Sequence, residues 1–188
     1  MTPVTWVLLI VAILAIVFGL LMYFRAEHSR KLKNKFGPEY DRVLHERGSA
    51  TRAERELEHR AKRVEKFNIR SLTPEECDRY AHDWQKTQER FVDDPRGAVT
   101  EADDLVNSAM KSRGYPVSRE FDERAADLSV DHSVVVEHYR AAHDIAGRAQ
   151  RNEASTEDLR LALQHYRALF EDLLGYHVAE IIGTGEKR

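Results

Sequence analysis

The stretch WVLLIVAILAIVFGLLMYF, from Trp6 to Phe24, decides the architecture of this chain. It contains no charged residue, and Gly19 is its only poor helix former. At 1.5 Å per residue it forms a helix about 28 Å long, close to the roughly 30 Å hydrocarbon core of a bilayer. Because lipid offers no hydrogen bonds to the backbone, the stretch predicts a transmembrane helix.

A cleaved signal peptide is the alternative interpretation of this stretch. Such a peptide has a basic start, a shorter apolar core and small residues at the cleavage site. No Lys or Arg precedes Trp6, and the following MYFRAEHSRKLKNK lacks a small-x-small pattern. Trp6, Tyr23 and Phe24 also lie where aromatic rings prefer the membrane interfaces. The sequence therefore favours an uncleaved, single-pass anchor.

Basic residues follow the span and none precedes it, which indicates the orientation. Basic flanks stay in the cytoplasm, so we expect the N-terminus outside and the rest of the chain inside. The single Cys77 fits a reducing compartment. The residues expected to contact anionic lipid head groups are Arg25, Arg30, Lys31, Lys33 and Lys35.

The formal net charge of −3 conceals a division along the chain. Residues 25–70 contain 14 Lys and Arg against 8 Asp and Glu, whereas the chain from Ser71 onward contains 15 against 24. The basic part is attracted to the negative cytoplasmic leaflet, and the acidic part is repelled from it. An acidic distal part also argues against nucleic acid as a partner.

Almost every segment after the span has helical periodicity, and no strand or hairpin pattern is present. The sequence predicts an all-α protein with four parts: an N-terminal tail and transmembrane helix, a basic juxtamembrane segment with a charged helical stalk, a compact helical bundle, and a C-terminal tail. Their expected ranges are 1–24, 25–70, 71–176 and 177–188. Residues 50–67 have a thin, Ala-rich apolar stripe, which favours a solvated, weakly packed stalk over a coiled coil.

Four main helices are expected in the bundle, with a short helix near 118–127 between the second and the third. Their expected ranges are 74–92, 95–112, 131–151 and 156–174. Local signals mark the ends: Thr73, Asp94 and Ser155 are expected N-caps, and Gly114 is an expected left-handed stop. Asp131 or Ser133 is the expected cap of the third main helix.

Two stretches repeat a His-Tyr-Arg-Ala core: VVVEHYRAAH at 134–143 and LALQHYRALF at 161–170. Helical spacing places each Tyr among apolar residues, each Arg on the polar face and each His between them. The repeat predicts two antiparallel helices joined by a turn at 152–155, with both tyrosines in the core. A paired chemical device is the less favoured interpretation.

Signatures of catalysis and of cofactor binding are lacking. His138 and His143 lie about 140° apart around a helix, so they cannot chelate one metal ion together. His177 and Glu180 share a spacing of three, which is a weak metal signal alone. The sequence contains no Gly-rich phosphate loop and no zincin or nucleophile-elbow motif. We therefore expect no catalytic, cofactor or metal site.

One polar cluster is a weaker candidate site, at the junction before the third main helix. Its residues are Arg124, Asp127, Asp131, His132 and His138. Asp131 beside His132 could orient an imidazole for acid–base chemistry. Helix capping and ion pairs explain the same residues without catalysis, and we favour that interpretation.

Several motifs resemble a family of bacterial proteins with one N-terminal membrane span and no known activity. They are FGPEYDR, RFVDDPRGAVTEADDLV, MKSRGYP and FDERAADLSVDHSVVVEHYRAAH, and they cover most of the chain beyond the anchor. The resemblance implies a bacterial origin, hence the inner membrane, and an all-helical domain. It supplies no residue with a known role.

The leading hypothesis is a membrane-tethered interaction or scaffold module, a binding protein in preference to an enzyme, whose protein partner the sequence does not identify. Its other expected partners are the bilayer and its anionic head groups. Two alternatives remain open. One is a helical enzyme or ligand-binding domain that uses the neighbourhood of Asp131, His132 and His138. The other is an envelope or stress protein that lies on the membrane through its basic segment.

Overall fold

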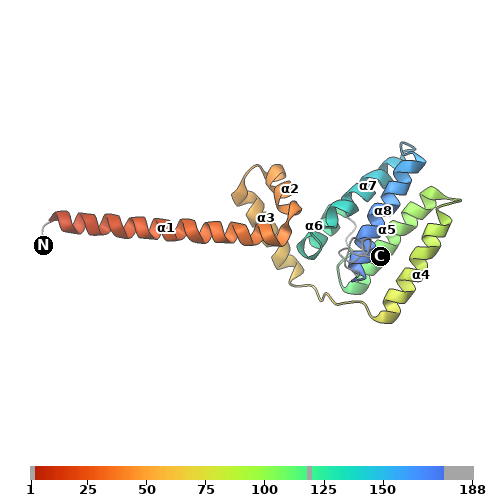
Figure 1. Cartoon of the computed structure of the whole chain (residues 1–188), viewed down its shortest axis with the longest axis horizontal. Helices are drawn as coiled ribbons and strands as arrows, with labels where there is room; N and C mark the ends of the chain where they lie inside the picture. The colour runs from red at the N-terminus through yellow and green to blue at the C-terminus, as the bar shows by residue number, and fades with distance from the viewer. Residues whose placement is uncertain (1–2, 118–119, 176–188) are drawn as a thin grey trace, which may run out of the picture. The chain divides into compact units, whose positions relative to one another are not determined.

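A computed structural model of the chain describes residues 3–117 and 120–175, and the predicted C-terminal tail at 177–188, with His177 and Glu180, lies outside these residues. The described part contains eight helices and no strand, which confirms the all-α class (Figure 1). The helices are α1 (Pro3–Phe36), α2 (Pro38–Arg47), α3 (Ala50–Val64), α4 (Pro74–Arg90), α5 (Pro95–Arg113), α6 (Phe121–Asp131), α7 (Val136–Gln150) and α8 (Thr156–Leu173). Contacts divide the chain into two compact units, Met1–Leu57 and Glu58–Arg188, here called the proximal and the distal unit.

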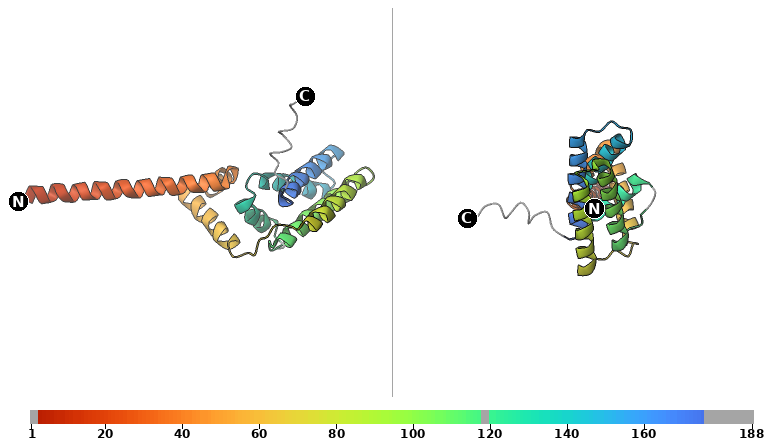
Figure 2. Two further views of the ribbon diagram at one scale, coloured as in Figure 1. Left: turned by 60° about the horizontal axis from the view of Figure 1, so that its bottom comes forward. Right: turned by 90° about the vertical axis from the view of Figure 1, so that its right-hand side faces the viewer.

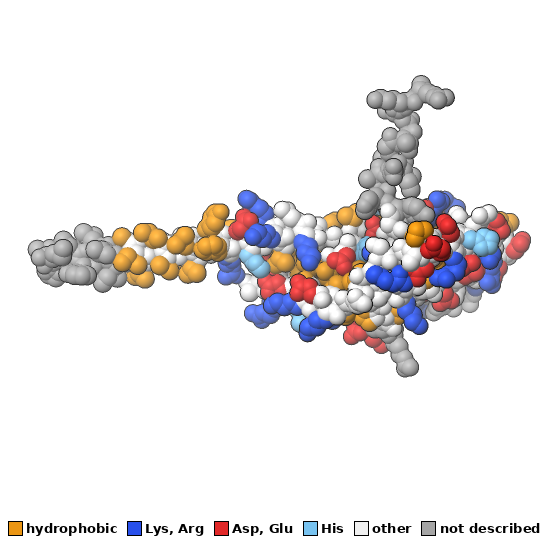
Figure 3. Space-filling view, turned by 90° about the horizontal axis from the view of Figure 1, so that it is seen from below, with side chains coloured by type: hydrophobic (Ala, Val, Ile, Leu, Met, Phe, Trp, Pro, Cys, Tyr) orange, Lys and Arg blue, Asp and Glu red, His pale blue; other side chains and the backbone are white. Residues whose placement is uncertain are grey.

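The apolar stretch and the basic run after it form one continuous helix, α1, of 34 residues. Within the described residues, α1 is the one helix that is long and apolar enough to cross a membrane. Every residue from 11 to 24 is exposed, and Phe18 reaches 67% exposure. Figure 3 shows these hydrophobic side chains around the helix, with Lys and Arg side chains where it continues.

Polar contacts hold α2 and α3 near the end of α1 in the proximal unit. The Tyr40 hydroxyl donates to Glu54 Oε1 at 3.1 Å and lies 3.3 Å from Ser29 Oγ. Arg25 Nη2 donates to Thr51 Oγ1 at 2.6 Å. The buried apolar side chains of this unit are Leu32, Phe36, Tyr40, Val43, Ala53 and Leu57.

The interpretation of residues 50–67 as a weakly packed stalk is wrong. Ala53 and Leu57 are fully buried, and Val64 is 5% exposed. Small side chains allow close helix approach, so an Ala-rich stripe is sufficient where the partner supplies the bulk. Arg63 also forms an ion pair with Asp127 of α6, with Nη2 and Oδ1 2.6 Å apart.

Local capping signals define the main helices of the distal unit. At α4, Thr73 Oγ1 accepts from Glu76 N at 3.2 Å and the Glu76 carboxylate accepts from Thr73 N at 2.9 Å. Ser155 and Asp158 form the same capping box at α8. Asp94 Oδ1 accepts from Gly97 N at 2.9 Å at the start of α5. These predicted caps are confirmed, because each depends only on residues within one turn.

The predicted start of the third main helix is wrong. The shorter helix α6 continues to Asp131, and α7 begins only at Val136, with Val135 rather than Asp131 or Ser133 at its N-cap position. Burial explains the difference, because Leu128 and Val130 of α6 are 0% and 5% exposed. These apolar side chains stabilise one more helical turn than the polar pattern indicated.

The distal helices pack in the order α4, α5, α8 and α7, each against the next (Figure 2). Helix α6 contacts α7. Trp84 of α4 stacks on Phe170 of α8 with ring centroids 4.7 Å apart, and Tyr139 and Tyr166 meet edge to face at 6.3 Å. Both tyrosines are fully buried, as the repeated motif predicted.

Candidate functional site

A chain of polar side chains crosses the apolar core of the distal unit. Arg124 Nε donates to the Tyr139 hydroxyl at 3.1 Å, and this hydroxyl donates to Asn107 Oδ1 at 3.4 Å. Asn107 Nδ2 then donates to Asp103 Oδ2 at 3.2 Å. The chain thus connects α6, α7 and α5. Buried polar groups normally have partners, and up to this point each of them does.

The polar chain ends at a cavity where two buried polar atoms have no hydrogen-bond partner. These atoms are Asp103 Oδ1 and the Tyr166 hydroxyl oxygen. The Tyr166 hydroxyl lowers the pKa of Asp103 through a hydrogen-bonding interaction, although the orientation of the two groups is too poor for a well-formed hydrogen bond. An unsatisfied buried polar group costs about 1–3 kcal/mol. Because the Asp103 and Tyr166 oxygen atoms both lie at this cavity, the cavity is the candidate site.

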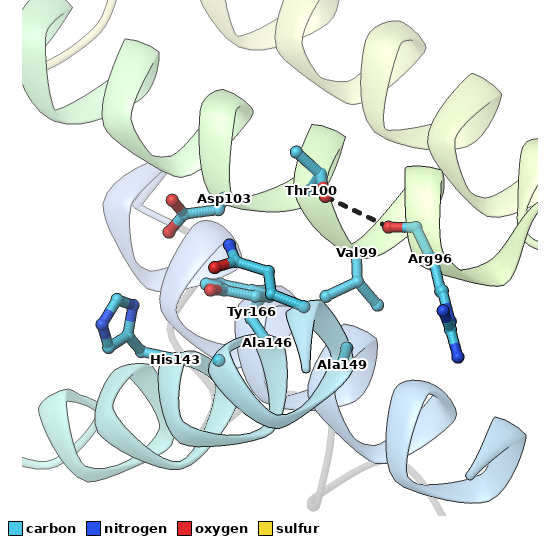
Figure 4. A pocket seen from close by; sticks show the side chains of 10 residues that line it. Arg96, Val99, Thr100, Asp103, His143, Ala146, Ala149 and Tyr166 are labelled. Atoms are coloured by element: carbon cyan, nitrogen blue, oxygen red, sulfur yellow. Dashed lines mark hydrogen bonds between the residues drawn. The ribbon is translucent and has the colours of Figure 1, made fainter. Parts of the chain in front are cut away.

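The cavity has a volume of about 350 Å³ and lies between α5, α7 and α8 (Figure 4). Asp103, Tyr166 and His143 lie toward one end of it, and Val99 and Ala149 lie toward the other. Its lining residues are Arg96, Val99, Thr100, Asp103, His143, Ala146, Gly147, Ala149, Gln150 and Tyr166. A small pocket with apolar walls and a few convergent polar groups is typical of a ligand site.

Burial controls the protonation of the groups at the polar end. It raises the pKa of Asp103 above its ordinary value, and the neighbouring Tyr166 and Arg124 oppose part of this increase. It also raises the pKa of Tyr166 and lowers the pKa of His143. Phe121 fixes the His143 ring by stacking, with centroids 3.6 Å apart and planes 4° apart. Near neutral pH, His143 and Tyr166 are therefore uncharged.

The five residues of the predicted polar cluster have separate partners. Arg124 belongs to the polar chain, Asp127 pairs with Arg63, and Asp131 Oδ2 accepts from Tyr115 at 2.9 Å. None of the five lines the cavity. The remaining two, His132 and His138, have partners on α8.

Those two histidines occupy different environments. His132 Nδ1 contacts the Asp172 carboxylate, and its Nε2 lies 3.4 Å from Arg113 Nη1. His138 Nδ1 lies 2.9 Å from His165 Nδ1, so one imidazole donates to the other. The repeated His-Tyr motif thus produces a histidine pair and a tyrosine pair across α7 and α8. Among the described residues, no group of three His, Cys, Asp or Glu forms a metal site.

The spacing of apolar residues in α5 indicates that Asp103 is at a core position, but a charged residue is not normally expected there. Val99, Asp103, Val106 and Met110 follow spacings of four, three and four, so Asp103 occupies a core position of α5. Asn107 follows one turn after Asp103. A carboxylate in an apolar stripe with an amide one turn later indicates a buried polar network.

Comparisons with protein-family models, with curated proteins and with solved structures find no match to this chain. Its function is therefore inferred from the geometry and the chemistry of its own residues.

We expect Asp103→Asn to stabilise the protein near neutral pH. The folded-state pKa of Asp103 lies above its ordinary value of 3.8, so folded chains hold the proton where unfolded chains release it. The native Asp103 therefore lowers stability as the pH rises above 3.8 toward the folded-state pKa. Melting temperatures of the full chain in detergent, measured against pH, should be higher for the variant and depend less on pH. A lower melting temperature at pH 7 would contradict this assignment.

Proposed function

We propose that this protein is a single-pass membrane protein whose distal helices act as an interaction module on the cytoplasmic face of a bacterial inner membrane. The observation that carries the membrane part of the proposal is the exposure of α1, whose apolar side chains from Val11 to Phe24 are covered by no other part of the described chain. A continuous apolar surface of this size is unfavourable in water. A bilayer would cover it.

The basic residues support the orientation. Arg25, Arg30, Lys31, Lys33 and Lys35 lie on the same helix, immediately after the apolar part, and all five are exposed. Because the helix is continuous, these cations stay at the membrane surface when the apolar part is inserted. Each basic residue near an anionic leaflet contributes about 1 kcal/mol of attraction. The rest of the proximal unit, α2 and the start of α3, would then lie at the membrane surface.

Cysteine labelling tests the proposed topology. In a Cys77→Ala background, we expect the Lys62→Cys variant to react with a membrane-impermeant maleimide only after bacterial spheroplasts are permeabilised. The Thr2→Cys variant should react in intact spheroplasts. Each variant is the control for the other, because both are labelled under the same conditions in spheroplasts of the same strain. The opposite labelling pattern would overturn the cytoplasmic assignment.

We expect Leu14→Arg combined with Phe18→Arg to abolish membrane integration. Each Arg near the centre of a span adds about 2.5–3.5 kcal/mol to the free energy of membrane insertion. Two of them outweigh the favourable contribution of the apolar residues that remain in the span. The measurement is the fraction of protein that stays in the pellet after alkaline carbonate extraction. The control is Leu14→Ile with Phe18→Leu, which should remain in the pellet. Retention of the double Arg variant would contradict a transmembrane role for α1.

A further inference from the structure

The cavity between α5, α7 and α8 contains polar groups that favour a cationic ligand, a property separate from the proposed membrane anchoring. Tyr166 is fully buried, yet its hydroxyl forms no well-aligned hydrogen bond, and neither does the buried Oδ1 of Asp103. The positive charge of Arg124 lowers the pKa of Asp103, but Arg124 Nε donates to the Tyr139 hydroxyl. Burial of the carboxylate is unfavourable and raises the pKa of Asp103, and a cationic guest beside Oδ1 would offset this cost.

Three hydrogen-bond acceptors converge at this end of the cavity. Asp103 supplies a carboxylate oxygen, Tyr166 supplies a hydroxyl oxygen, and a neutral His143 supplies one ring nitrogen (Figure 4). A primary ammonium group carries three N–H donors on one positive centre. The three N–H donors therefore equal the three acceptors in number, and the positive charge of the ammonium group complements the negative charge of the Asp103 carboxylate.

The rest of the cavity limits what the ammonium group can carry. Val99, Ala146 and Ala149 provide apolar walls, which favour a short alkyl chain over a polar one. Arg96 lies at the exposed rim and donates to the side chain of Asn152. Its positive charge disfavours a second ammonium group at that end. The volume of about 350 Å³ is at the small end of the range for ligand pockets.

We propose that this cavity binds a small primary monoamine in its ammonium form. Asp103, Tyr166 and His143 accept its three N–H groups, and its aliphatic chain contacts the walls formed by α5 and α7. The polar chain from Arg124 through Tyr139 and Asn107 holds Asp103 in place for this contact. Asp103 is then the residue that distinguishes a charged amine from a neutral molecule of the same shape.

The test is calorimetric titration of the full chain, in nonionic detergent at pH 7, with n-butylammonium chloride and separately with n-butanol. The two probes have the same length and differ in charge. We expect saturable binding of n-butylammonium and at least about tenfold weaker binding of n-butanol, since a charge-assisted hydrogen bond to a buried carboxylate accounts for such a ratio.

Three variants locate the binding. Asp103→Asn should weaken n-butylammonium binding by about tenfold or more, and Tyr166→Phe by a smaller factor. Asp104→Asn removes an exposed carboxylate at the next position of α5 and should leave binding unchanged. Circular dichroism melting of each variant verifies folding. Equal affinity for the two probes or unchanged affinity in Asp103→Asn would show that Asp103 does not select an ammonium group, and no saturable binding would show that the cavity holds water only. Each result would overturn the proposal without affecting the membrane assignment.

Discussion

Gly114→Ala is expected to destabilise the distal unit by about 2–5 kcal/mol, because two separate costs combine at this position. Gly114 ends α5 in the left-handed conformation, with φ of 97°. A Cβ atom there would lie 2.3 Å from the carbonyl oxygen of Asn68. That carbonyl belongs to backbone held in place by a hydrogen bond from Arg70 N to Arg113 O at 2.8 Å, so it cannot move away cheaply.

Gly175 provides a matched control, since it also has a positive φ, of 86°, but no described atom lies within 4 Å of the position that a Cβ would occupy there. Gly175→Ala should therefore cost only the left-handed strain, about 1–2 kcal/mol. Asn tolerates the left-handed region, so Gly114→Asn retains the steric cost while Gly175→Asn should be nearly neutral. Urea unfolding of the full chain in detergent measures all four variants. Equal costs for Ala at the two positions would contradict the close approach of Asn68.

The contrast between these glycines shows what the sequence could predict. The stop of α5 at Gly114 was predictable from SRGYP, because a left-handed glycine followed by proline is a local signal. The close approach of Asn68 was not, since it depends on how the segment before α4 returns along the end of α5. Local rules located the starts of α4, α5 and α8 but not that of α7, and the distances between helices depend on packing of the whole unit.

The candidate site illustrates the same limit. The inward direction of Tyr139 and Tyr166 was predictable from the spacing within each helix, and both are fully buried. The meeting of Arg124, Tyr139, Asn107 and Asp103 was not predictable, because three helices contribute to it and their relative rotations are not encoded in any one of them. The pairing of His138 with His165 likewise depends on the register between α7 and α8.

Phe170→Ala is expected to cost about 3–5 kcal/mol, the usual range for removing a fully buried aromatic ring. Phe170 is 2% exposed on α8 and contacts two aromatic rings of α4: it stacks on Trp84 at 4.7 Å and meets Tyr80 edge to face at 6.1 Å. Such pairs contribute about 0.5–1.5 kcal/mol beyond the apolar area they bury. A domain of this size is typically stable by about 5–15 kcal/mol, so the loss is a large fraction of the total.

Leu161→Ala on the same helix is the matched control, because Leu161 is 37% exposed and its removal opens no enclosed cavity. It should cost less than about 1 kcal/mol. In a Trp6→Phe background, Trp84 is the sole tryptophan, and its fluorescence reports directly on the contact with α8. We expect Phe170→Ala to shift this emission as well as the urea midpoint, whereas Leu161→Ala should shift neither appreciably. A fluorescence change without a loss of stability would mean that α4 is held by its capping box and its contacts with α5, and that the aromatic stack only reports on its position.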